Sequence, residues 1–440
     1  MRAFGTLILA LLLALALFAC DAADDSDSEF DAASETPAQD DDDADDNEAT
    51  DEPAGRSGPT IERDCEPVAP EPWPDPDFAD PAEVAFDDNL FFTVDDQRFF
   101  PLGYYGVPRD EESLETFKEE GFNIALTGPG CCGSGTQPQI DWLRLAQQEE
   151  IFVIMHPWSS SNDVLTRPEE DLEQELIERN DVGSLFGWYT FDEPALHRPS
   201  KELTERMHYI LSTYSADHPD CLVEQTMDDF NLYVDDCAFF MIDPYPLPYM
   251  FINMVKYSML EAEMATEGEK PIVGVMQSFS WEWYEGNWDA IFHPNGAEMR
   301  NMAWQFIIFG ARGLIPWKYT GDYTIHAVPD IWSDYLETVA EMNELMGVIL
   351  ADEADIDLAA ETTFPNSLDY VVKQDETATW VFSVSTNEHG LYVEYDLSAL
   401  GDGLCVVDYT TGEIFEQDDD GKIRVKYDAL QVRVLEIMEN

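Results

Sequence analysis

The stretch that decides the fold runs from Leu185 to Pro194 and reads L-F-G-W-Y-T-F-D-E-P. Its first seven residues are apolar or aromatic except for one Gly and one Thr, a composition typical of a short strand buried on both faces. The strand ends on Asp192 and Glu193, because Pro194 cannot continue a hydrogen-bonded ladder. Two adjacent carboxylates at such a position must be solvated, paired or used. One interpretation is that Asp192 caps the following helix, and the other makes Glu193 a proton donor.

Strand-like and helix-like stretches alternate on both sides of this segment. The expected strands are Pro101–Val107, Asn123–Thr127, Phe152–Pro157, Leu185–Phe191, Leu222–Thr226, Phe239–Asp243, Ile272–Gln277 and Leu314–Tyr319. The expected helices are Glu111–Glu120, Gln139–Glu149, Pro168–Asn180, Ser200–Ser215, Phe251–Thr266, Ala297–Gly310 and Ile331–Leu350. Asp95-Asp96 between two apolar runs also predicts a hairpin before the first strand.

This alternation predicts an α/β protein with a (β/α)8 TIM barrel over residues 65–350. Eight strands over roughly 250 residues match the number and size of such a barrel. An open doubly wound sheet is the alternative, although it would need no eighth strand. No Gly-rich phosphate-binding fingerprint follows any of the strands.

After Leu350 the sequence changes to short alternating runs separated by turns. The runs are Tyr370–Lys373, Thr379–Ser385, Gly390–Tyr395, Cys405–Asp408, Lys422–Tyr427 and Gln431–Ile437. They predict a small C-terminal β-sandwich over residues 351–440, packed on the barrel and serving stability.

The N-terminal 64 residues differ from the folded part. Residues 1–20 combine a basic start, a short apolar core and a small residue before Cys20, which is typical of an export signal peptide rather than a membrane span. Leu17-Phe18-Ala19-Cys20 resembles the lipobox of bacterial lipoproteins, which implies that Cys20 is lipidated; a plain secretory signal is the alternative. Residues 21–64 hold 18 acidic residues and two arginines, which predicts a disordered acidic tether. We therefore expect an exported, membrane-anchored lipoprotein that faces the periplasm or the cell exterior.

The whole chain is strongly acidic, with a formal net charge of −70 at pH 7. The tether accounts for only −16 of this, so the folded part is acidic as well. Such a surface repels nucleic acid and anionic lipid head groups. It suits a salty medium, in which the self-repulsion is screened.

In a barrel, the carboxyl ends of all strands open at one mouth, where ligands bind. The candidate residues there are carboxylates, aromatics and a few amides: Tyr104, Tyr105, His156, Trp158, Asp192, Glu193, Asp243, Tyr245, Gln277, Trp281, Glu282, Trp317 and Tyr319. Aromatic rings stack on sugar rings, and carboxylates and amides bind hydroxyl groups. Lys318, between Trp317 and Tyr319, is the exception in a mouth otherwise nearly free of cations. Phosphorylated substrates are therefore disfavoured.

The hairpin, the Asp192-Glu193-Pro194 motif and the β-rich C-terminal region together resemble the barrel glycoside hydrolases. In the large retaining group of that family, the fourth strand ends in Asn-Glu-Pro and its Glu is the general acid/base. Glu193 and Pro194 match this motif, and Asp192 replaces the Asn. The resemblance covers residues 90–440, although only the strand-four motif is tight. It implies hydrolysis of O-glycosidic bonds in an oligo- or polysaccharide, with Glu193 as the general acid/base.

The sequence departs from that family at the seventh strand, where the family places its nucleophilic Glu and this chain has Gln277. Three arrangements would supply the missing group. Glu282 folds back as the nucleophile, or Asp243 takes that role. In the third, the substrate's own N-acetyl group attacks, as in barrel hexosaminidases, while Asp192 orients it and Tyr245 hydrogen-bonds the intermediate. The alternative from another class is a non-catalytic glycan-binding lipoprotein.

Each catalytic arrangement requires a proton on Glu193 near neutral pH. Burial against Trp188 or Trp317 and a neighbouring negative charge would both raise the pKa of Glu193. The separation of the two carboxyl groups then sets the stereochemical outcome.

The sequence predicts no metal and no cofactor. His156 lacks a partner at metal-ligand spacing, since His197 and His208 are far along the chain and no HExxH motif occurs. A substrate-contacting or core histidine is the favoured interpretation.

An exported chain with six cysteines besides Cys20 predicts disulfides. Cys221 and Cys237 each precede a strand, the fifth and the sixth, at a spacing that suits a bridge. Cys131 and Cys132 follow the second strand and form either a vicinal bridge or two free thiols. By elimination, Cys65 pairs with Cys405.

Overall fold

The computed structural model describes residues 65, 67–70, 72–74, 76, 78, 82–127, 136–158, 163–282, 292–356, 358–375 and 377–438. They belong to one compact unit, Cys65–Asn440. The expected signal peptide and tether, with Cys20, lie outside the described residues, as do Cys131 and Cys132.

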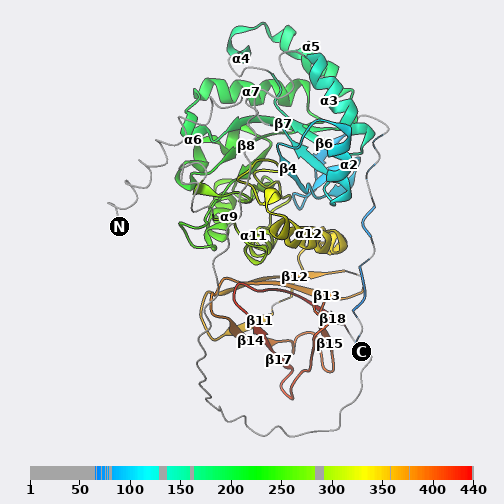
Figure 1. Ribbon diagram of the computed structural model, residues 1–440, viewed down its shortest axis with the longest axis vertical. Helices are drawn as coiled ribbons and strands as arrows, with labels where there is room; N and C mark the ends of the chain where they lie inside the picture. Colours follow the sequence, from blue (N-terminus) through cyan, green and yellow to red (C-terminus); the bar gives the residue numbers. More distant parts are fainter. Residues whose placement is uncertain are drawn as a thin grey trace, which may run out of the picture. The chain divides into compact units, whose positions relative to one another are not determined.

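A parallel sheet forms the barrel wall (Figure 1). Its strands, each paired with the next, are β4 (Gly103–Tyr105), β5 (Ile124–Leu126), β6 (Phe152–Met155), β7 (Leu185–Asp192), β8 (Asp220–Glu224), β9 (Phe239–Ile242) and β10 (Ile272–Gly274). Residues 313–317 close the ring as the eighth strand, because Leu314 bridges both Leu102 and Gly274 in parallel. Trp317 N donates to Met276 O at 3.1 Å and extends this closure. The predicted (β/α)8 barrel is confirmed.

Alternation along the strands sorts the barrel side chains into two cores. Tyr105, Phe186 and Tyr189 belong to the core inside the barrel. Their neighbours Tyr104 and Leu185 belong to the core between the wall and the surrounding helices. A step of one residue along a strand therefore decides whether a side chain faces the barrel interior.

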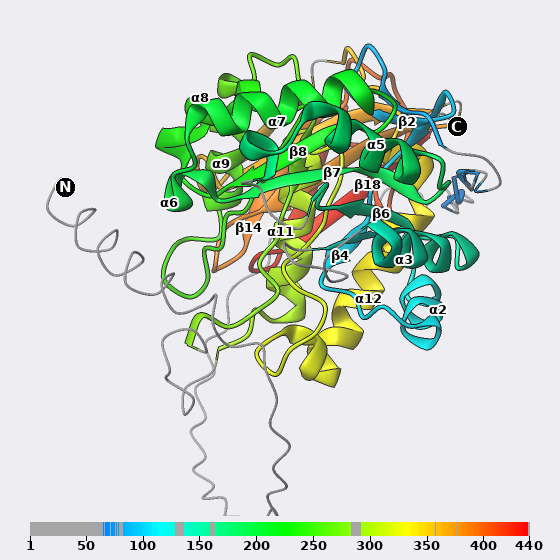
Figure 2. The same ribbon diagram turned by 90° about the horizontal axis from the view of Figure 1, so that it is seen from above.

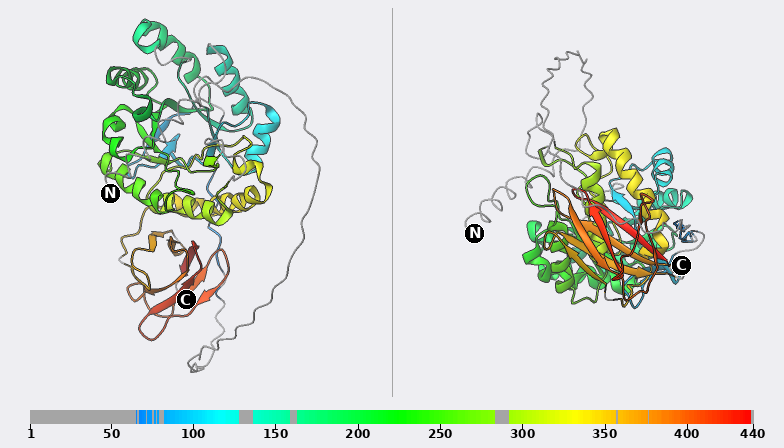
Figure 3. Two further views of the ribbon diagram at one scale, coloured as in Figure 1. Left: turned by 60° about the vertical axis from the view of Figure 1, so that its left-hand side comes forward. Right: turned by 90° about the horizontal axis from the view of Figure 1, so that it is seen from below.

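Helices surround the wall, and the left view of Figure 3 shows them around the strands. They are α2 (Glu111–Glu119), α3 (Thr136–Gln148), α4 (Asp163–Thr166), α5 (Glu169–Asn180), α6 (Pro194–His197), α7 (Lys201–Tyr214), α8 (Phe230–Tyr233), α9 (Met254–Ala265), α11 (Gly296–Ile308), α12 (Pro329–Glu344) and α13 (Met346–Ile349). Figure 2 shows α7 running along β7 and β8. Within the described ranges, no helix is both long and apolar enough to cross a membrane.

The predicted hairpin belongs to a small antiparallel sheet of β1 (Val84–Phe86), β2 (Phe92–Val94) and β3 (Gln97–Phe99). Val94 pairs with Gln97, so Asp95 and Asp96 form a two-residue turn, with φ of 50° and 68°. Phe92 packs against Phe239 inside the barrel, with ring centroids 5.0 Å apart. Val84 N donates to the carbonyl of Asp217, ahead of β8. The hairpin therefore fills the end of the barrel opposite the mouth.

The C-terminal region is antiparallel and β-rich. One sheet has the order β11 (Ala359–Thr362), β14 (Leu391–Asp396) and β17 (Lys422–Tyr427). The other has the order β12 (Leu368–Gln374), β13 (Thr379–Ser385), β18 (Val432–Met438), β15 (Cys405–Asp408) and β16 (Ile414–Phe415). Side chains of both sheets share one apolar core. Each of the six predicted runs is a strand, while β11 and β16 were not predicted.

Helix α11 joins the barrel to the C-terminal region. Trp304 packs on Phe382 of β13 with ring centroids 4.9 Å apart. The buried Asn301 amide donates to Ser385 O at 2.8 Å and to Leu430 O at 2.7 Å. Such satisfied buried polar contacts fix one docking arrangement.

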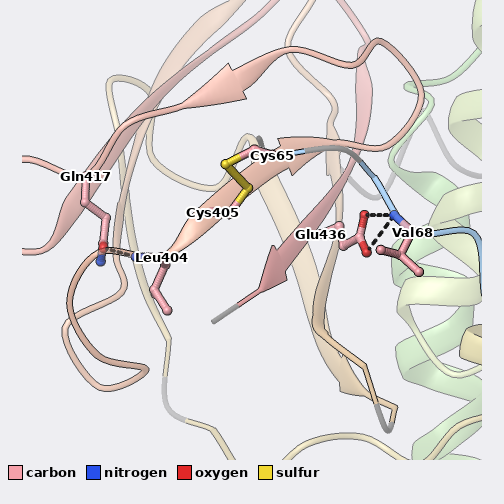
Figure 4. Close-up of a disulfide and its surroundings, with 6 residues drawn as sticks. All are labelled: Cys65, Val68, Leu404, Cys405, Gln417 and Glu436. Carbon is pink, nitrogen blue, oxygen red and sulfur yellow. Dashed lines mark hydrogen bonds between the residues drawn. A yellow bond between two sulfur atoms is a disulfide. The ribbon is translucent and has the colours of Figure 1, made fainter. Parts of the chain in front are cut away.

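A disulfide links Cys65, at the start of the compact unit, to Cys405 of β15 across 340 residues (Figure 4). The backbone N–H of Val68 donates to both carboxylate oxygens of Glu436 nearby, at 3.2 and 3.1 Å. The pairing reached by elimination is confirmed, and it holds the entry segment on the C-terminal sheet.

The predicted bridge between Cys221 and Cys237 is wrong, because both are buried free thiols. Cys221 belongs to the core inside the barrel, whereas Cys237 belongs to the core outside the wall. Cys237 Sγ donates instead to Val234 O at 3.5 Å. The strands are adjacent, but the two side chains point to opposite faces.

Candidate active site

The turn after β7 holds Glu193 in one conformation. Its backbone lies in the left-handed region, with φ 41° and ψ 64°, which non-glycine residues rarely adopt. Its N–H donates to Val223 O at 3.0 Å, and its carbonyl accepts from Leu196 N at 2.9 Å. A backbone of this kind costs about 1–3 kcal/mol and persists where its surroundings enforce it. Here β8 and α6 enforce it from both sides.

Glu224, the last residue of β8, is fully buried and was not among the predicted site residues. Its Oε2 accepts from Ala195 N at 2.7 Å, and its Oε1 accepts from Thr226 N at 2.8 Å. The carboxylate therefore ties β8 to the turn that carries Glu193. Burial raises the pKa of Glu224, while these backbone hydrogen bonds lower it. The signal that would have identified it is a carboxylate at a strand's last residue, as with Asp192.

Asp243 directly follows β9 and is only 3 % exposed. Burial raises its pKa well above its usual range, and the charges of Glu193 and Asp192 raise it further. The pKa of Glu193 is raised to about 7, chiefly by burial and then by the charge of Asp192. The charge of Glu224 raises the pKa of Glu193 and that of Asp243 further.

Glu193 and Asp243 form a carboxyl pair. When both are ionised, Asp243 Oδ1 is buried without a donor. A side-chain hydrogen bond between the two groups lowers the pKa of Glu193 and raises the pKa of Asp243, so Asp243 holds the proton in that bond. Ionisation of one carboxyl in such contact disfavours ionisation of the other, so the pair titrates as a unit.

Asp192 lies beside this pair and is held from inside the barrel. Tyr189 Oη donates to Asp192 Oδ1 at 2.6 Å. Burial raises the pKa of Asp192, and the Tyr189 hydrogen bond lowers it. Tyr105 packs edge-on against Tyr189, with ring centroids 5.8 Å apart. Asp192 therefore does not cap the next helix, whose first turn is instead bonded to Glu224.

Aromatic side chains surround the carboxyls. The pKa of Tyr245 is raised well above its usual range by burial and then by the charge of Asp243. Its ring lies 6.1 Å from that of Trp281, whose Nε1 donates to Tyr245 O at 3.2 Å. Trp317 packs against Tyr105 with ring centroids 5.2 Å apart. Tyr245 therefore lies beside the carboxyl pair, Trp281 packs on Tyr245, and Trp317 packs on Tyr105 inside the barrel.

His156 lies below the mouth and is 6 % exposed. Its ring meets Tyr189 edge-on, with centroids 5.9 Å apart. Burial lowers its pKa to about 4, so the imidazole is neutral at pH 7. No group of three or more His, Cys, Asp or Glu side chains suits a metal ion anywhere in the described ranges.

Some predicted residues do not reach the mouth. Tyr104, Trp158 and Tyr319 belong to the core between the wall and the helices. Tyr319 Oη donates to Glu120 on α2's C-terminal side at 2.7 Å. Trp188 also faces outward, with Nε1 donating to Ser215 Oγ at 2.8 Å, so it does not bury Glu193 as expected. The strand alternation described above separates these residues from the inward-facing Tyr105 and Tyr189.

Gln277 occupies the end of the seventh strand, and its amide is fully engaged. Its Oε1 accepts from Leu247 N at 2.8 Å, and its Nε2 donates to Leu247 O at 2.6 Å and to Phe279 O at 3.2 Å. The amide therefore fastens the loop after β9 to the segment that follows β10, the seventh strand of the barrel. This side chain is a structural clamp in the structure.

Glu282 is hydrogen-bonded within the loop after the seventh barrel strand. Its Oε2 accepts from Ser280 Oγ at 2.6 Å and from Phe292 N at 3.3 Å. The charges that act on Glu193 come from Asp192 and Glu224. Among the three arrangements expected from the sequence, the geometry therefore favours Asp243 over Glu282 as the second carboxylate.

A cavity of about 340 Å³ lies toward the opposite end of the barrel. Lys270, Ile272 and Arg312 are among its lining residues. Lys270 Nζ donates there to Val234 O and Cys237 O, at 2.8 and 2.6 Å. The strand-end carboxylates do not line this cavity, so it is separate from the candidate site.

No protein-family model matches the sequence, and neither does any curated protein sequence. Solved structures do match the fold. One is described as a glycoside hydrolase and is 12% identical in sequence. The match covers 82% of this chain and 97% of the other chain, with a TM-score of 0.57. A glycoside hydrolase of family 5 from Bacteroides vulgatus is 12% identical, with coverages of 81% and 94% and a TM-score of 0.54. At this identity the likeness shows a shared barrel fold, and the chemistry must be argued from the site.

Proposed function

We propose that this protein hydrolyses O-glycosidic bonds in an extracytoplasmic carbohydrate. Glu193 acts as the general acid/base, and Asp243 is its partner carboxylate. The observation that carries the proposal is the buried carboxyl pair at the barrel mouth, in which the pKa of Asp243 is raised and that of Glu193 is raised to about 7. A general acid must be protonated at working pH, which a pKa near neutrality provides. The fold likeness agrees with this proposal without carrying it.

The reaction uses the pair in two steps. Glu193 donates its proton to the glycosidic oxygen as the bond from that oxygen to the anomeric carbon breaks. Asp243, then ionised, attacks the anomeric carbon and forms a glycosyl ester. Glu193 next takes a proton from water, whose oxygen displaces Asp243 and releases the sugar. Substrate binding must first separate the two carboxyls and leave their proton on Glu193, because in the free protein the two are hydrogen-bonded with the proton on Asp243.

With Asp243 as the nucleophile, the proposed reaction retains the anomeric configuration. Inverting enzymes separate their carboxyls by about 6.5–9.5 Å to admit a water, and retaining enzymes by about 5 Å. A contact pair opens to the shorter distance with less movement. Attack by a substrate N-acetyl group also gives retention, and in that case Asp192, fixed by Tyr189, orients the acetamide.

The test is hydrolysis of aryl glycosides and soluble polysaccharides by the full chain and its variants. Glu193→Gln and Asp243→Asn are each expected to lower kcat/KM by about 10²–10⁴-fold. Glu282→Gln separates the alternatives, because a loss as large as that of Asp243→Asn would assign the nucleophile to Glu282. NMR of the first-formed product anomer checks retention. Glycan binding without turnover on any substrate would favour the non-catalytic binding protein.

We also propose that the chain is exported and anchored through lipid on Cys20. The apolar segment and the lipobox-like residues before Cys20 support this, and the Cys65–Cys405 disulfide suits an oxidising compartment. A Cys20→Ser variant is expected to move from the membrane fraction to the soluble extracytoplasmic fraction. Membrane association that persists in this variant would refute the anchor.

A further inference from the structure

Three consecutive large side chains stand exposed on the loop between β9 and α9. Tyr249, Met250 and Phe251, here called the rim segment, are 57%, 51% and 80% exposed. Phe251 is the most exposed large apolar side chain in the part of the chain that the structure describes. Contiguous exposed apolar side chains on a soluble protein mark binding sites, whereas isolated ones need no explanation.

The loop that carries the rim segment is held firmly at both ends. On one side, the Gln277 amide makes two hydrogen bonds to Leu247, as described above. On the other, the buried Gln305 amide donates to Ile252 O at 3.2 Å. Met250 N also donates to Pro246 O at 2.6 Å and closes a turn within the loop. Two fully buried amides thus fix a loop whose outermost side chains gain little burial, which pre-organises them for a ligand.

The loop that carries the rim segment begins at the carboxyl pair. The loop starts at Asp243, and Tyr245 next to it is close enough for the charges of Asp243 and Glu193 to raise its pKa. Leu247 is fastened to Gln277 at the end of the neighbouring strand, so the loop leaves the barrel at the mouth. Along this loop Tyr245 comes first, beside the carboxyls, and the rim segment follows it four residues later.

We propose that the rim segment binds further units of a neutral polysaccharide chain whose scissile bond lies at Glu193. Sugar rings present apolar C–H faces, and Tyr and Phe rings offer large apolar surfaces with little flexibility. The acidic mouth and the net charge of −70 disfavour an anionic glycan and an anionic lipid surface. The inference rests on the proposed function and adds that the substrate is a polymer rather than a single glycoside.

The experiment measures binding separately from turnover. The full chain carrying Glu193→Gln is run in native gels containing mixed-linkage β-glucan, galactomannan, arabinoxylan, starch or polygalacturonate. The test variant adds Tyr249→Ala and Phe251→Ala, and the matched control adds Tyr209→Ala, a tyrosine of α7 that is 55% exposed. Thermal unfolding of each variant confirms that it is folded. The rim and control substitutions are also made in the chain that keeps Glu193. For each of these proteins, the ratio of kcat/KM on polysaccharide to kcat/KM on an aryl glycoside is measured.

We expect the double change to weaken binding of at least one neutral polysaccharide about tenfold, while the Tyr209 control binds as its parent does. The kcat/KM ratio should fall in parallel. Equal binding by the test variant and the control overturns the inference, as does a parent that binds no neutral polysaccharide or binds only polygalacturonate. Loss of binding to phosphatidylcholine vesicles, with glycan binding unchanged, would assign the rim segment to a membrane and overturn it too.

The failures of the two proposals are distinguishable. Aryl-glycoside hydrolysis that depends on Glu193, together with polysaccharide binding that the rim substitutions do not change, would support the proposed function and contradict the role of the rim segment. Polysaccharide binding that depends on the rim segment, without turnover of any substrate, would support the binding role and contradict the proposed hydrolase function.

Discussion

Glu193 combines a left-handed backbone with a buried carboxyl whose pKa is about 7. The left-handed backbone does not stabilise the fold. The strained turn is fixed by Val223 and Glu224 of β8 rather than by contacts of the Glu193 side chain. Backbone strain and perturbed pKa values cluster at functional sites, which supports the role proposed for Glu193.

The raised pKa makes a prediction about stability that does not depend on activity. Because the folded pKa of about 7 exceeds the ordinary 4.5, the folded state holds this proton more tightly than the unfolded state. The contribution to the free energy of unfolding is therefore full below about pH 4.5 and is lost as pH rises through 7. Replacing Glu193 with Gln removes this loss. The free energy of unfolding is measured with denaturant at pH 5 and pH 8. The value for the variant minus that for the natural chain should be about 1–3 kcal/mol larger at pH 8 than at pH 5. An equal difference at both pH values would contradict the buried, proton-sharing pair.

Glu224 is a positioning residue, because it acts on Glu193 through Ala195 N and through its own charge. In Glu224→Gln the amide keeps one acceptor but sets its NH₂ against one of the two backbone donors. Removing the charge also lowers the pKa of Glu193, so the alkaline limb of the kcat/KM profile should move to lower pH. A pH–rate profile of the natural chain and the variant measures this. A lower rate with an unmoved limb would limit Glu224 to holding the turn.

At the level of elements, the loop after β9 depends on Gln277. An ionised Glu at this position cannot donate to Leu247 O or Phe279 O, so both of these hydrogen bonds are lost. Gln277→Glu is therefore expected to lower the free energy of unfolding by about 1–3 kcal/mol and to bring no gain in turnover. Gln305→Glu is the matched control, since Gln305 is also buried and donates to Ile252 O in the same loop. A rise in turnover only for Gln277→Glu would instead identify the position as a vacated nucleophile site.

The sequence predicted the elements better than the faces and ends of its strands. The barrel follows from repeated apolar runs, and these were placed to within a few residues. Predicting Leu222–Thr226 where β8 is Asp220–Glu224 hid Glu224 inside a strand, although it ends one. Adjacent tyrosines such as Tyr104 and Tyr105 could not be assigned to faces, since a shift of one residue exchanges them.

Some site features depend on distant parts of the chain. The contact between Glu193 and Asp243 joins the ends of two strands 50 residues apart, and no local pattern encodes it. The clamp of Gln277 on Leu247 is equally non-local. Cys221 and Cys237 had suitable spacing, but the facing of their side chains decided against a bridge.

At the scale of the whole molecule, the net charge of −70 dominates the electrostatics. Self-repulsion opposes the compact state and is screened by salt, with a Debye length of about 10 Å at 0.1 M and about 3 Å at 1 M. The Tm of the full chain should therefore rise as sodium chloride increases from about 0.1 M to about 1 M. Chloride is the appropriate salt, because sulfate would add a separate stabilising effect. A Tm that is constant or falls would contradict this electrostatic account.

The most direct test of the central claim is the dependence of the Glu193→Gln defect on the leaving group. A dinitrophenolate departs without a proton, whereas a sugar hydroxyl needs one. Glu193→Gln should therefore lose about 10²–10⁴-fold in kcat/KM on an oligosaccharide and much less on the matching 2,4-dinitrophenyl glycoside. Asp243→Asn should lose activity on both. Equal losses by Glu193→Gln on the two substrates, or full activity of Asp243→Asn, would contradict the assignment of the pair.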